Sequence, residues 1–348
     1  MAVATPRQPV DVTLMRGGTS RGPVLLADSL PQDQAARDAA VLRLVGGEQV
    51  QTDGLGGGSP TTSKVVVVKP APDDSSDPII EYSVGNIVVG RNAVDWSGTC
   101  GNMTATVPLY ALEERIVPAL WDTPLRLRNT STGRLIETFV ASARLHERGR
   151  EAVVTTRHLD PSGTVLGSLL PTGAGTDRIR LGSSTYQASL VDVTHPYLFL
   201  LHEEVVGNGD IREPDTLKLI ELLRGEMCVR LGLAASADDA AHSSPAVPRV
   251  VLVHQRDDDD CIEISAVSMG QPIATVPVTA AMCLTAACRI PSTLFASKST
   301  DRSSEAKLTV ASPGARLSAC AKIDSSGHIA FVSVDRTART IMHGTAWI

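Results

Sequence analysis

The sequence predicts an α+β protein of two domains, in which strands surround one apolar helix in each half. The chain has 348 residues, which is long for one small core and fits two domains of roughly 100 to 200 residues each. Only 3% of the residues are aromatic, while valine, isoleucine, threonine, glycine and proline are plentiful, a composition typical of strands and turns. A similar order of strands and one apolar helix occurs in both halves, so the second half loosely repeats the first.

The first half begins with an alternating strand at residues 10–15, followed by a glycine-rich loop at residues 16–22. A helix is predicted to start at Ser29, its N-cap. A second, apolar helix follows Cys100, with a kink expected at Pro108. Further strands, mainly antiparallel, are predicted at residues 65–68, 79–84, 86–91, 125–128, 134–144, 151–156, 177–181 and 185–193.

The second half contains a helix at residues 214–231 and a final apolar helix at residues 279–289. We expect a first domain at residues 1–184, completed by the C-terminal segment 333–348, and a second domain at residues 185–332. The strands of the second half are predicted at residues 187–193, 197–202, 249–254 and 262–268.

Composition excludes several classes of function. The net charge is −6 and no run of lysine or arginine occurs, so neither nucleic acid nor an anionic membrane is an expected partner. No membrane span or signal peptide is recognisable, which makes the cytoplasm the default location. The six cysteines lack the spacing of zinc or redox sites, and neither a metal nor a cofactor is expected. A homodimer is compatible with the sequence, which does not fix the oligomeric state.

Cys100 is a candidate functional thiol. The Gly-Asn pair that follows it opens an apolar helix, and the unpaired amides at a helix N-terminus favour a thiolate and bind carboxylates. The alternative is a small buried hydrophobic residue, which is the commoner fate of a cysteine. The turn pair after Cys100 favours the functional interpretation.

Lys64 lies where a glycine-rich loop becomes an apolar strand. Successive bare amides in residues 53–58 suit an anion, and a lysine partly removed from water favours the neutral amine that can accept a proton. The alternative is a surface lysine with its head in water. The segment is not a phosphate-binding loop, because Ser63 precedes the lysine and the strand follows it.

Three other features have ordinary structural explanations. The two adjacent glycines in residues 16–20 suit a hairpin turn. The acidic run at residues 257–260 is expected to cap a hairpin in solvent rather than to hold a metal. His195 could orient a substrate, although a lone histidine more often satisfies local hydrogen bonds.

Taken together and in order, four segments resemble the motifs of the PrpF family: MRGGTS at residues 15–20, DGLGG at 53–57, TSK at 62–64 and CGN at 100–102. The resemblance extends to residues 128–133, 170–173 and 189–192, the helix at 279–289 and RTAR at 336–339. It covers nearly the whole chain, and the ordered set is more specific than any single motif.

The resemblance implies a diaminopimelate epimerase-like fold, with two pseudo-symmetric domains that each wrap a barrel-like sheet around a central helix, and an active site in the cleft between them. Lys64 and Cys100 match the catalytic pair of the family. Its members isomerise methylaconitate, aconitate, methylitaconate or oxalomesaconate, so the chain is expected to be a cofactor-independent isomerase of a small unsaturated di- or tricarboxylic acid. Substrate contacts are expected at Thr19, Ser20, Gly57, Gly58, Ser63, Gly101, Asn102, Met103, Thr279, Ala280, Ala281 and Met282.

The expected chemistry is asymmetric: Lys64 is the better candidate base, whereas Cys100 acts as acid, base or orienting group, and the second domain closes over the carboxylates. Arg21, residues 60–61 and residues 194–196 depart from the usual family pattern, which leaves the substrate open. The alternatives are an oxalomesaconate-type tautomerase and a non-catalytic protein that supports an aconitase-like enzyme. An amino-acid epimerase would need a second thiol at the start of the final helix, whereas Cys283 lies a turn inside it.

Overall fold

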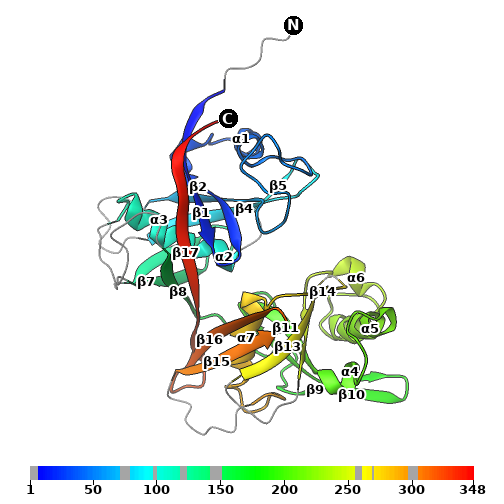
Figure 1. Ribbon diagram of the computed structural model, residues 1–348. Helices are drawn as coiled ribbons and strands as arrows, with labels where there is room; N and C mark the ends of the chain where they lie inside the picture. Colours follow the sequence, from blue (N-terminus) through cyan, green and yellow to red (C-terminus); the bar gives the residue numbers. More distant parts are fainter. Residues whose placement is uncertain are drawn as a thin grey trace. The chain divides into compact units, whose positions relative to one another are not determined.

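The computed structural model describes residues 7–70, 79–96, 100–117, 124–141, 151–254, 261–268, 270–296 and 305–348. Strands dominate, joined by turns and a few helices (Figure 1). The chain divides into two compact units, Met1–Arg157 with Asp335–Ile348, and His158–Val334, which we name the first and the second unit. Residues 158–184, expected in the first domain, lie in the second unit, where β9 (Asp177–Leu181) pairs with β10 (Ser184–Val193).

A mixed sheet forms the frame of the first unit. Its strands are β1 (Pro9–Gly17), β2 (Ser20–Leu26), β3 (Lys64–Lys69), β4 (Ile79–Ile87), β5 (Val94–Asp95), β6 (Leu125–Asn129), β7 (Leu135–Val140), β8 (Ala152–Leu159) and the last part of β17 (Ile329–Trp347). β17 and β2 flank β1, and both pairs are antiparallel (Figure 1). Parallel pairs join β2 to β3 and β4 to β6, whereas β3 with β4, β4 with β5, and β6 with β7 are antiparallel.

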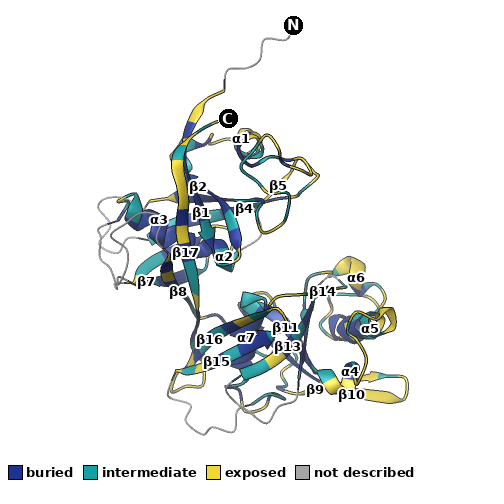
Figure 2. Ribbon diagram, in the orientation of Figure 1, coloured by how far each residue is buried: buried dark blue, intermediate teal, exposed yellow. Residues whose placement is uncertain are grey.

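Helices pack on both faces of this sheet. On one face α1 (Gln34–Val45) contributes to a core with Val65 and Val67 of β3. On the other face α2 (Gly101–Thr104) and α3 (Thr106–Glu113) share a core with Val66 and Val68. The apolar run of β3 is therefore buried on both sides, and α3, which covers one of them, is itself largely buried (Figure 2).

The helix expected after Cys100 is broken into α2 and α3 at Ala105. The break lies upstream of Pro108, although the sequence placed the kink at the proline itself. A proline lacks the N–H that would bond the carbonyl four residues earlier, and its ring clashes with that carbonyl. That carbonyl belongs to Thr104, the last residue of α2, so the helix breaks about one turn before Pro108.

Several element boundaries differ from those predicted. The expected cap Ser29 ends a 3-10 helix (Ala27–Ser29), and α1 is capped by Asp33, whose side chain accepts from the amide of Ala36 at 2.9 Å. The loop expected at residues 16–22 lies mostly within β1 and β2, and only residues 18–19 form the turn. The two strands expected between residues 79 and 91 are the single strand β4. Residues 142–144, predicted as strand, lie outside the described residues, as do residues 257–260.

The second unit has a sheet with a similar sequence of pairings. Its strands are β9, β10, β11 (His195–Leu201), β12 (Arg249–Val253), β13 (Cys261–Ser268), β14 (Gln271–Ile273), β15 (Ala306–Ser312), β16 (Ala315–Ile323) and the first part of β17. Antiparallel pairs join β9 to β10, β10 to β11, β12 to β13, β13 to β14, β15 to β16 and β16 to β17. Parallel pairs join β11 to β12 and β13 to β15.

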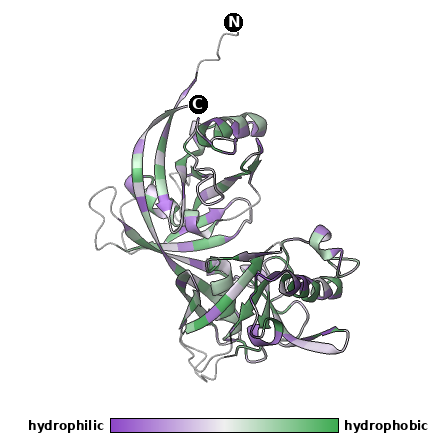
Figure 3. Ribbon diagram, turned by 45° about the vertical axis from the view of Figure 1, so that its right-hand side comes forward, coloured by the Kyte–Doolittle hydropathy of each residue, from purple (hydrophilic) through white to green (hydrophobic). Residues whose placement is uncertain are grey.

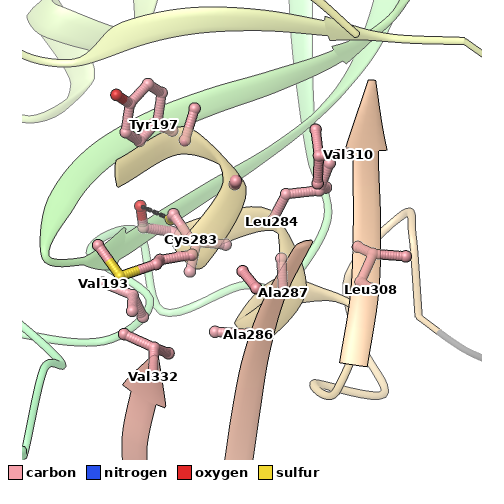
Figure 4. Packing of buried hydrophobic residues seen from close by; sticks show 14 of the residues in the cluster. Val193, Tyr197, Cys283, Leu284, Ala286, Ala287, Leu308, Val310 and Val332 are labelled. Carbon is pink, nitrogen blue, oxygen red and sulfur yellow. Dashed lines mark hydrogen bonds between the residues drawn. The ribbon is translucent and has the colours of Figure 1, made fainter. Parts of the chain in front are cut away.

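Two helices of the second unit differ in burial. Hydrophilic and hydrophobic residues alternate around α5 (Pro214–Arg230) (Figure 3), which packs against α4 (His202–Val205), α6 (Ala240–Ser243) and β12. In contrast, α7 (Val278–Ala287) is buried from Ala280 to Ala287 in the largest apolar cluster of the unit (Figure 4). Among the described residues, no helix is long and apolar enough to cross a membrane.

Candidate functional site

Lys64 and Ser20 project from neighbouring strands toward the same face of the first sheet. Side chains alternate between the two faces of a strand, so Lys64 shares the face of Val66, and Ser20 shares that of Val24. Both valines belong to the core formed with α2 and α3. Cys100 packs against the same core, so the lysine and the cysteine of the predicted pair face one region of the first unit.

Cys100 is the N-cap of α2 and is half-buried. Its sulfur lies 3.8 Å from the hydroxyl of Ser20. The carbonyl of Cys100 accepts two hydrogen bonds from Thr104, one from its amide at 2.9 Å and one from its Oγ1 at 3.1 Å. Thr104 Oγ1 also lies 3.0 Å from the phenol of the buried Tyr82 on β4. The thiol is thus held at a fixed position above the sheet.

The two glycines of the β1–β2 turn allow the start of α2 to approach the sheet closely. A Cβ at Gly17 would lie 2.1 Å from the carbonyl oxygen of Asn102, and one at Gly18 would lie 2.2 Å from its Oδ1. Asn102 Nδ2 donates to Thr19 Oγ1 at 3.0 Å. Glycine is therefore required here by space, and at Gly18 also by a φ of +51°.

Within the part of the chain that the structure describes, the Lys64 amine has one polar partner, Asn86 on β4, whose Oδ1 accepts from Nζ at 2.6 Å. The two residues face each other across the β3–β4 pair. A Cβ at Gly22 would lie 2.3 Å from the carbonyl oxygen of Lys64, so β2 and β3 run close together here. Asn86 was missed from the sequence, because only the register of β3 on β4 brings it to the lysine.

Two of the expected substrate residues, Gly58 and Ser63, contact Gln51 on the α1 side. Ser63 is buried, and its hydroxyl donates to Gln51 Oε1 at 2.8 Å; the amide of Gly58 donates to the same oxygen at 2.8 Å. Gly57 faces Arg21, whose Nη2 would lie 3.1 Å from a Cβ there. Their part in substrate binding stays a prediction, and the hydroxyl of Ser63 already has a protein partner.

The remaining expected residues lie at two helix starts. Gly101 opens α2, and the side chain of Met103 is fully buried. Thr279 is the second residue of α7 in the second unit, and its Oγ1 lies 2.7 Å from the phenol oxygen of Tyr197. The side chains of Ala280, Ala281 and Met282 are buried in the core of that unit. At α7 only backbone amides remain available for a ligand.

Arg336 on β17 was also missed as a site residue. It lies two residues before Ala338, which belongs to the core formed with α2 and α3, so its side chain projects to the face of Ser20 and Lys64. Its Cδ would lie 3.4 Å from a Cβ at Gly18. The sequence carried a signal, the RTAR segment at residues 336–339, but no reason to place it beside residues 18–20.

A separate group in the second unit consists of His202, Glu203 and His254, whose ligand atoms lie within 4.8 Å of one another. The two imidazole rings stack with centroids 3.8 Å apart and planes 21° apart. Imidazole lone pairs lie in the ring plane, so nearly parallel stacked rings do not converge on one ion. This arrangement does not suit a metal.

The family model described as PrpF protein matches residues 7–348. The chain belongs to the PrpF family. Among curated relatives of this PrpF member, the 3-methylitaconate isomerase of Eubacterium barkeri is 30% identical over 97% of each chain. The crystal structure of a methylitaconate-delta-isomerase superposes with a TM-score of 0.86 at 27% identity, covering 99% of this chain and 96% of the other.

The fold extends beyond the family. A hydroxyproline epimerase of Agrobacterium vitis matches with a TM-score of 0.55 at 13% identity, covering 99% of this chain and 93% of that one. At this identity the likeness concerns the fold alone. The expected epimerase-like, sheet-dominated fold is thereby confirmed at this coarse level.

Proposed function

We propose that this PrpF protein is a cofactor-independent isomerase of a small unsaturated di- or tricarboxylic acid. The observation that carries the proposal is the placement of a lysine amine and a cysteine thiol on one face of the first sheet, beside the amides that open α2. A relative named for methylitaconate isomerisation, similar along almost the whole chain, supports the substrate class.

In the proposed reaction, Lys64 removes a proton from a carbon that is α to a carboxylate or allylic to the double bond. The C–H electron pair delocalises into a dienolate, whose negative charge the amides at α2 stabilise. A proton then returns from Lys64 or from the Cys100 thiol to another carbon, or to the same carbon after rotation about a bond. The double bond moves or changes geometry, and no electron leaves the substrate.

Asn86 and Ser20 would position this pair. Asn86 holds the Lys64 amine through one hydrogen bond, and the hydroxyl of Ser20 lies next to the Cys100 sulfur. Thr19 and Asn102, which bond to each other, would present polar groups to a carboxylate. The predicted contacts through Gly57, Gly58 and Ser63 and through residues 279–282 are part of the same proposal. At α7 the amides of Thr279 and Ala280 would make them, because the amide of Ala281 already donates to the carbonyl of Pro277 at 3.0 Å.

We further propose that the two units are pseudo-symmetric copies, each with strands wrapped around a central helix. The pairings support this: β1–β2, β3–β4 and β6–β7 in the first unit correspond to β10–β11, β12–β13 and β15–β16 in the second. Parallel pairs join these hairpins in the same order. The central helices would then be α2 with α3, and α7. A cytoplasmic location and a homodimer stay predictions.

The test is proton exchange in heavy water. The protein is incubated with aconitate, methylaconitate, methylitaconate and oxalomesaconate, and NMR follows deuterium incorporation and isomer formation. We expect incorporation with at least one acid at the rate of its isomerisation or faster. Proline and hydroxyproline serve as controls for an amino-acid epimerase. Absence of exchange from every acid would overturn proton-transfer catalysis and favour a non-catalytic role.

A further inference from the structure

We propose that Arg336 binds one carboxylate of the substrate, at the site formed by Ser20, Lys64 and Cys100. This inference rests on the proposed function and adds to it a charged residue that selects for a polyanionic substrate. The juxtaposition that carries it is an arginine side chain whose Cδ packs beside Gly18, on the same face of the sheet as the lysine and the thiol.

The position of Arg336 is fixed by its neighbours on β17. The amide of Gly18 donates to the carbonyl of Thr337 at 2.7 Å, which ties β17 to the β1–β2 turn. Gly17 and Ala338 are direct partners in the β1–β17 pair and face the same core. The Arg336 side chain follows on that face and passes Gly18, whose other neighbour is the Asn102 side chain. It therefore ends next to the start of α2.

Arg336 differs from the structural arginine beside it. Arg16 on β1 donates to the carbonyl and hydroxyl of Thr337 at 2.8 and 2.7 Å and pairs with Glu151. Among the described residues, Arg336 forms no salt bridge, and its buried Nε has no hydrogen-bond partner. The neighbouring Asp335 projects to the other face, where its Oδ1 accepts from Thr155 at 2.6 Å. Arg336 is half-buried, and a partly buried guanidinium without an anion among the described residues lacks the partner that arginine normally has.

The charges around Arg336 favour binding of an anion. Burial lowers the pKa of Arg336, while the acidic groups of Asp335 and Cys100 act in the opposite direction. The guanidinium still remains charged at neutral pH, because its ordinary pKa lies above 12. The chain as a whole is acidic, so a substrate with two or three carboxylates needs a local cation besides Lys64, which must be neutral to act as a base. A carboxylate accepts two parallel hydrogen bonds from one guanidinium.

The experiment measures binding of tricarballylate, a saturated tricarboxylate that cannot isomerise, by calorimetry. Arg336→Gln is expected to weaken binding about 10- to 100-fold, the range for losing a hydrogen-bonded charged partner. Arg336→Lys should bind with intermediate affinity, because it keeps the positive charge but loses the two parallel N–H donors of the guanidinium. The matched control is Arg339→Gln: Arg339 is exposed, lies on the same strand and projects to the other face, and this variant should bind like the wild type.

A second variant keeps the test decisive if Arg336→Gln fails to fold. Arg336→Ala with millimolar guanidinium ion should recover part of the lost affinity, while Arg336→Ala alone should not, a result that a purely structural role does not give. In turnover, the variants should raise KM far more than they lower kcat. Equal binding by Arg336→Gln and Arg339→Gln, or no binding of tricarballylate by the wild type, overturns the inference. Because binding needs no turnover, these outcomes are separate from failure of the isomerase proposal.

Discussion

The sheets of the two units share an order of strand pairings and each unit contains an apolar helix, but the proposed reactive groups, Lys64 and Cys100, both lie in the first unit. In the first unit, the helix begins at a half-buried thiol, Cys100, and β3 begins with Lys64. In the second unit, α7 has Pro277 as its N-cap, and its cysteine, Cys283, lies fully inside the core (Figure 4). Burial raises the pKa of the Cys283 thiol, which donates to the carbonyl of Val191 at 3.3 Å. One thiol faces a possible ligand and the other fills space.

The difference shows why a two-thiol epimerase mechanism does not fit this chain. Such a mechanism needs one acid or base at each central helix, and the position equivalent to Cys100 is a proline, which carries no proton to transfer. β3 and β12, each joined by a parallel pairing to the hairpin before it, also begin differently. Among the described residues, Lys64 at the start of β3 bonds to Asn86 alone, whereas Arg249 opens β12 beside Tyr197 and His195. We infer that the first unit supplies the proton chemistry, and substitutions in both units test this inference.

The largest effect is expected from Lys64→Met, which removes the proposed base and keeps the length of the side chain. Turnover of the substrate identified by proton exchange should fall at least about a thousand-fold, the upper part of the range for general base catalysis. The thermal midpoint should change little, because the lysine head is only partly buried. Asn86→Ala should show a smaller loss, since it acts through the lysine. Retention of activity in Lys64→Met would show that Lys64 of the first unit is not the base.

The two cysteines test the comparison directly. Cys100→Ala should lower kcat about 100-fold or more and leave the free energy of unfolding nearly unchanged. Cys283→Ala should do the reverse: activity stays within twofold, and stability falls by about 1–2 kcal/mol because a small cavity opens in the core. Steady-state kinetics and urea unfolding measured on both variants give the two numbers. Loss of activity in Cys283→Ala without loss of stability would assign the second thiol a role in the reaction.

The sequence predicted the strands with strong alternation or apolar runs, but it missed what depends on distant contacts. Lys64 and Cys100 were recognisable because each sits in a local motif. Arg336 and Asn86 reach the site only through strand pairing, in one case across more than 300 residues of chain. The substrate contact expected of Ser63 stays a prediction, and the bond of its hydroxyl to Gln51 could not be foreseen from the sequence. The strands β15, β16 and most of β17 were missed because alanine and serine weaken the alternation there.

His195, in the β10–β11 hairpin of the second unit, should make the free energy of unfolding depend on pH. Burial lowers the pKa of His195 from 6.5 to about 4, and the nearby Arg249 acts in the same direction, while the carbonyl of Ala246 and Asp192 oppose it. The native state therefore holds the imidazole neutral. Its contribution to stability is complete above pH 6.5 and is lost as the pH falls toward 4, because the unfolded chain takes up the proton first.

His195→Asn should remove this dependence. The difference in free energy of unfolding between wild type and variant should change by up to about 3 kcal/mol between pH 7 and pH 4, as measured by urea unfolding at several pH values. Ser20, in the corresponding hairpin of the first unit, does not titrate in this range, so Ser20→Ala is the control and should give a difference that is independent of pH. A wild-type-minus-His195→Asn difference that is constant with pH would contradict the buried neutral imidazole.

The smallest effect concerns the turns of the two hairpins. Gly18 has a φ of +51° in the first unit, and Thr194 has a φ of +62° between β10 and β11 in the second. A β-branched residue is strained in this region, at a cost of about 1–2 kcal/mol, and among the described residues the buried Oγ1 of Thr194 has no hydrogen-bond partner. Thr194→Gly should therefore raise the free energy of unfolding by about 0.5–1 kcal/mol, after the extra flexibility of glycine in the unfolded chain is subtracted.

Thr194→Ala separates the two causes, because it removes the hydroxyl but keeps a Cβ at positive φ, and it should gain less stability than the glycine variant. Equal or lower stability of Thr194→Gly in urea unfolding would show that the second unit tolerates this turn without strain.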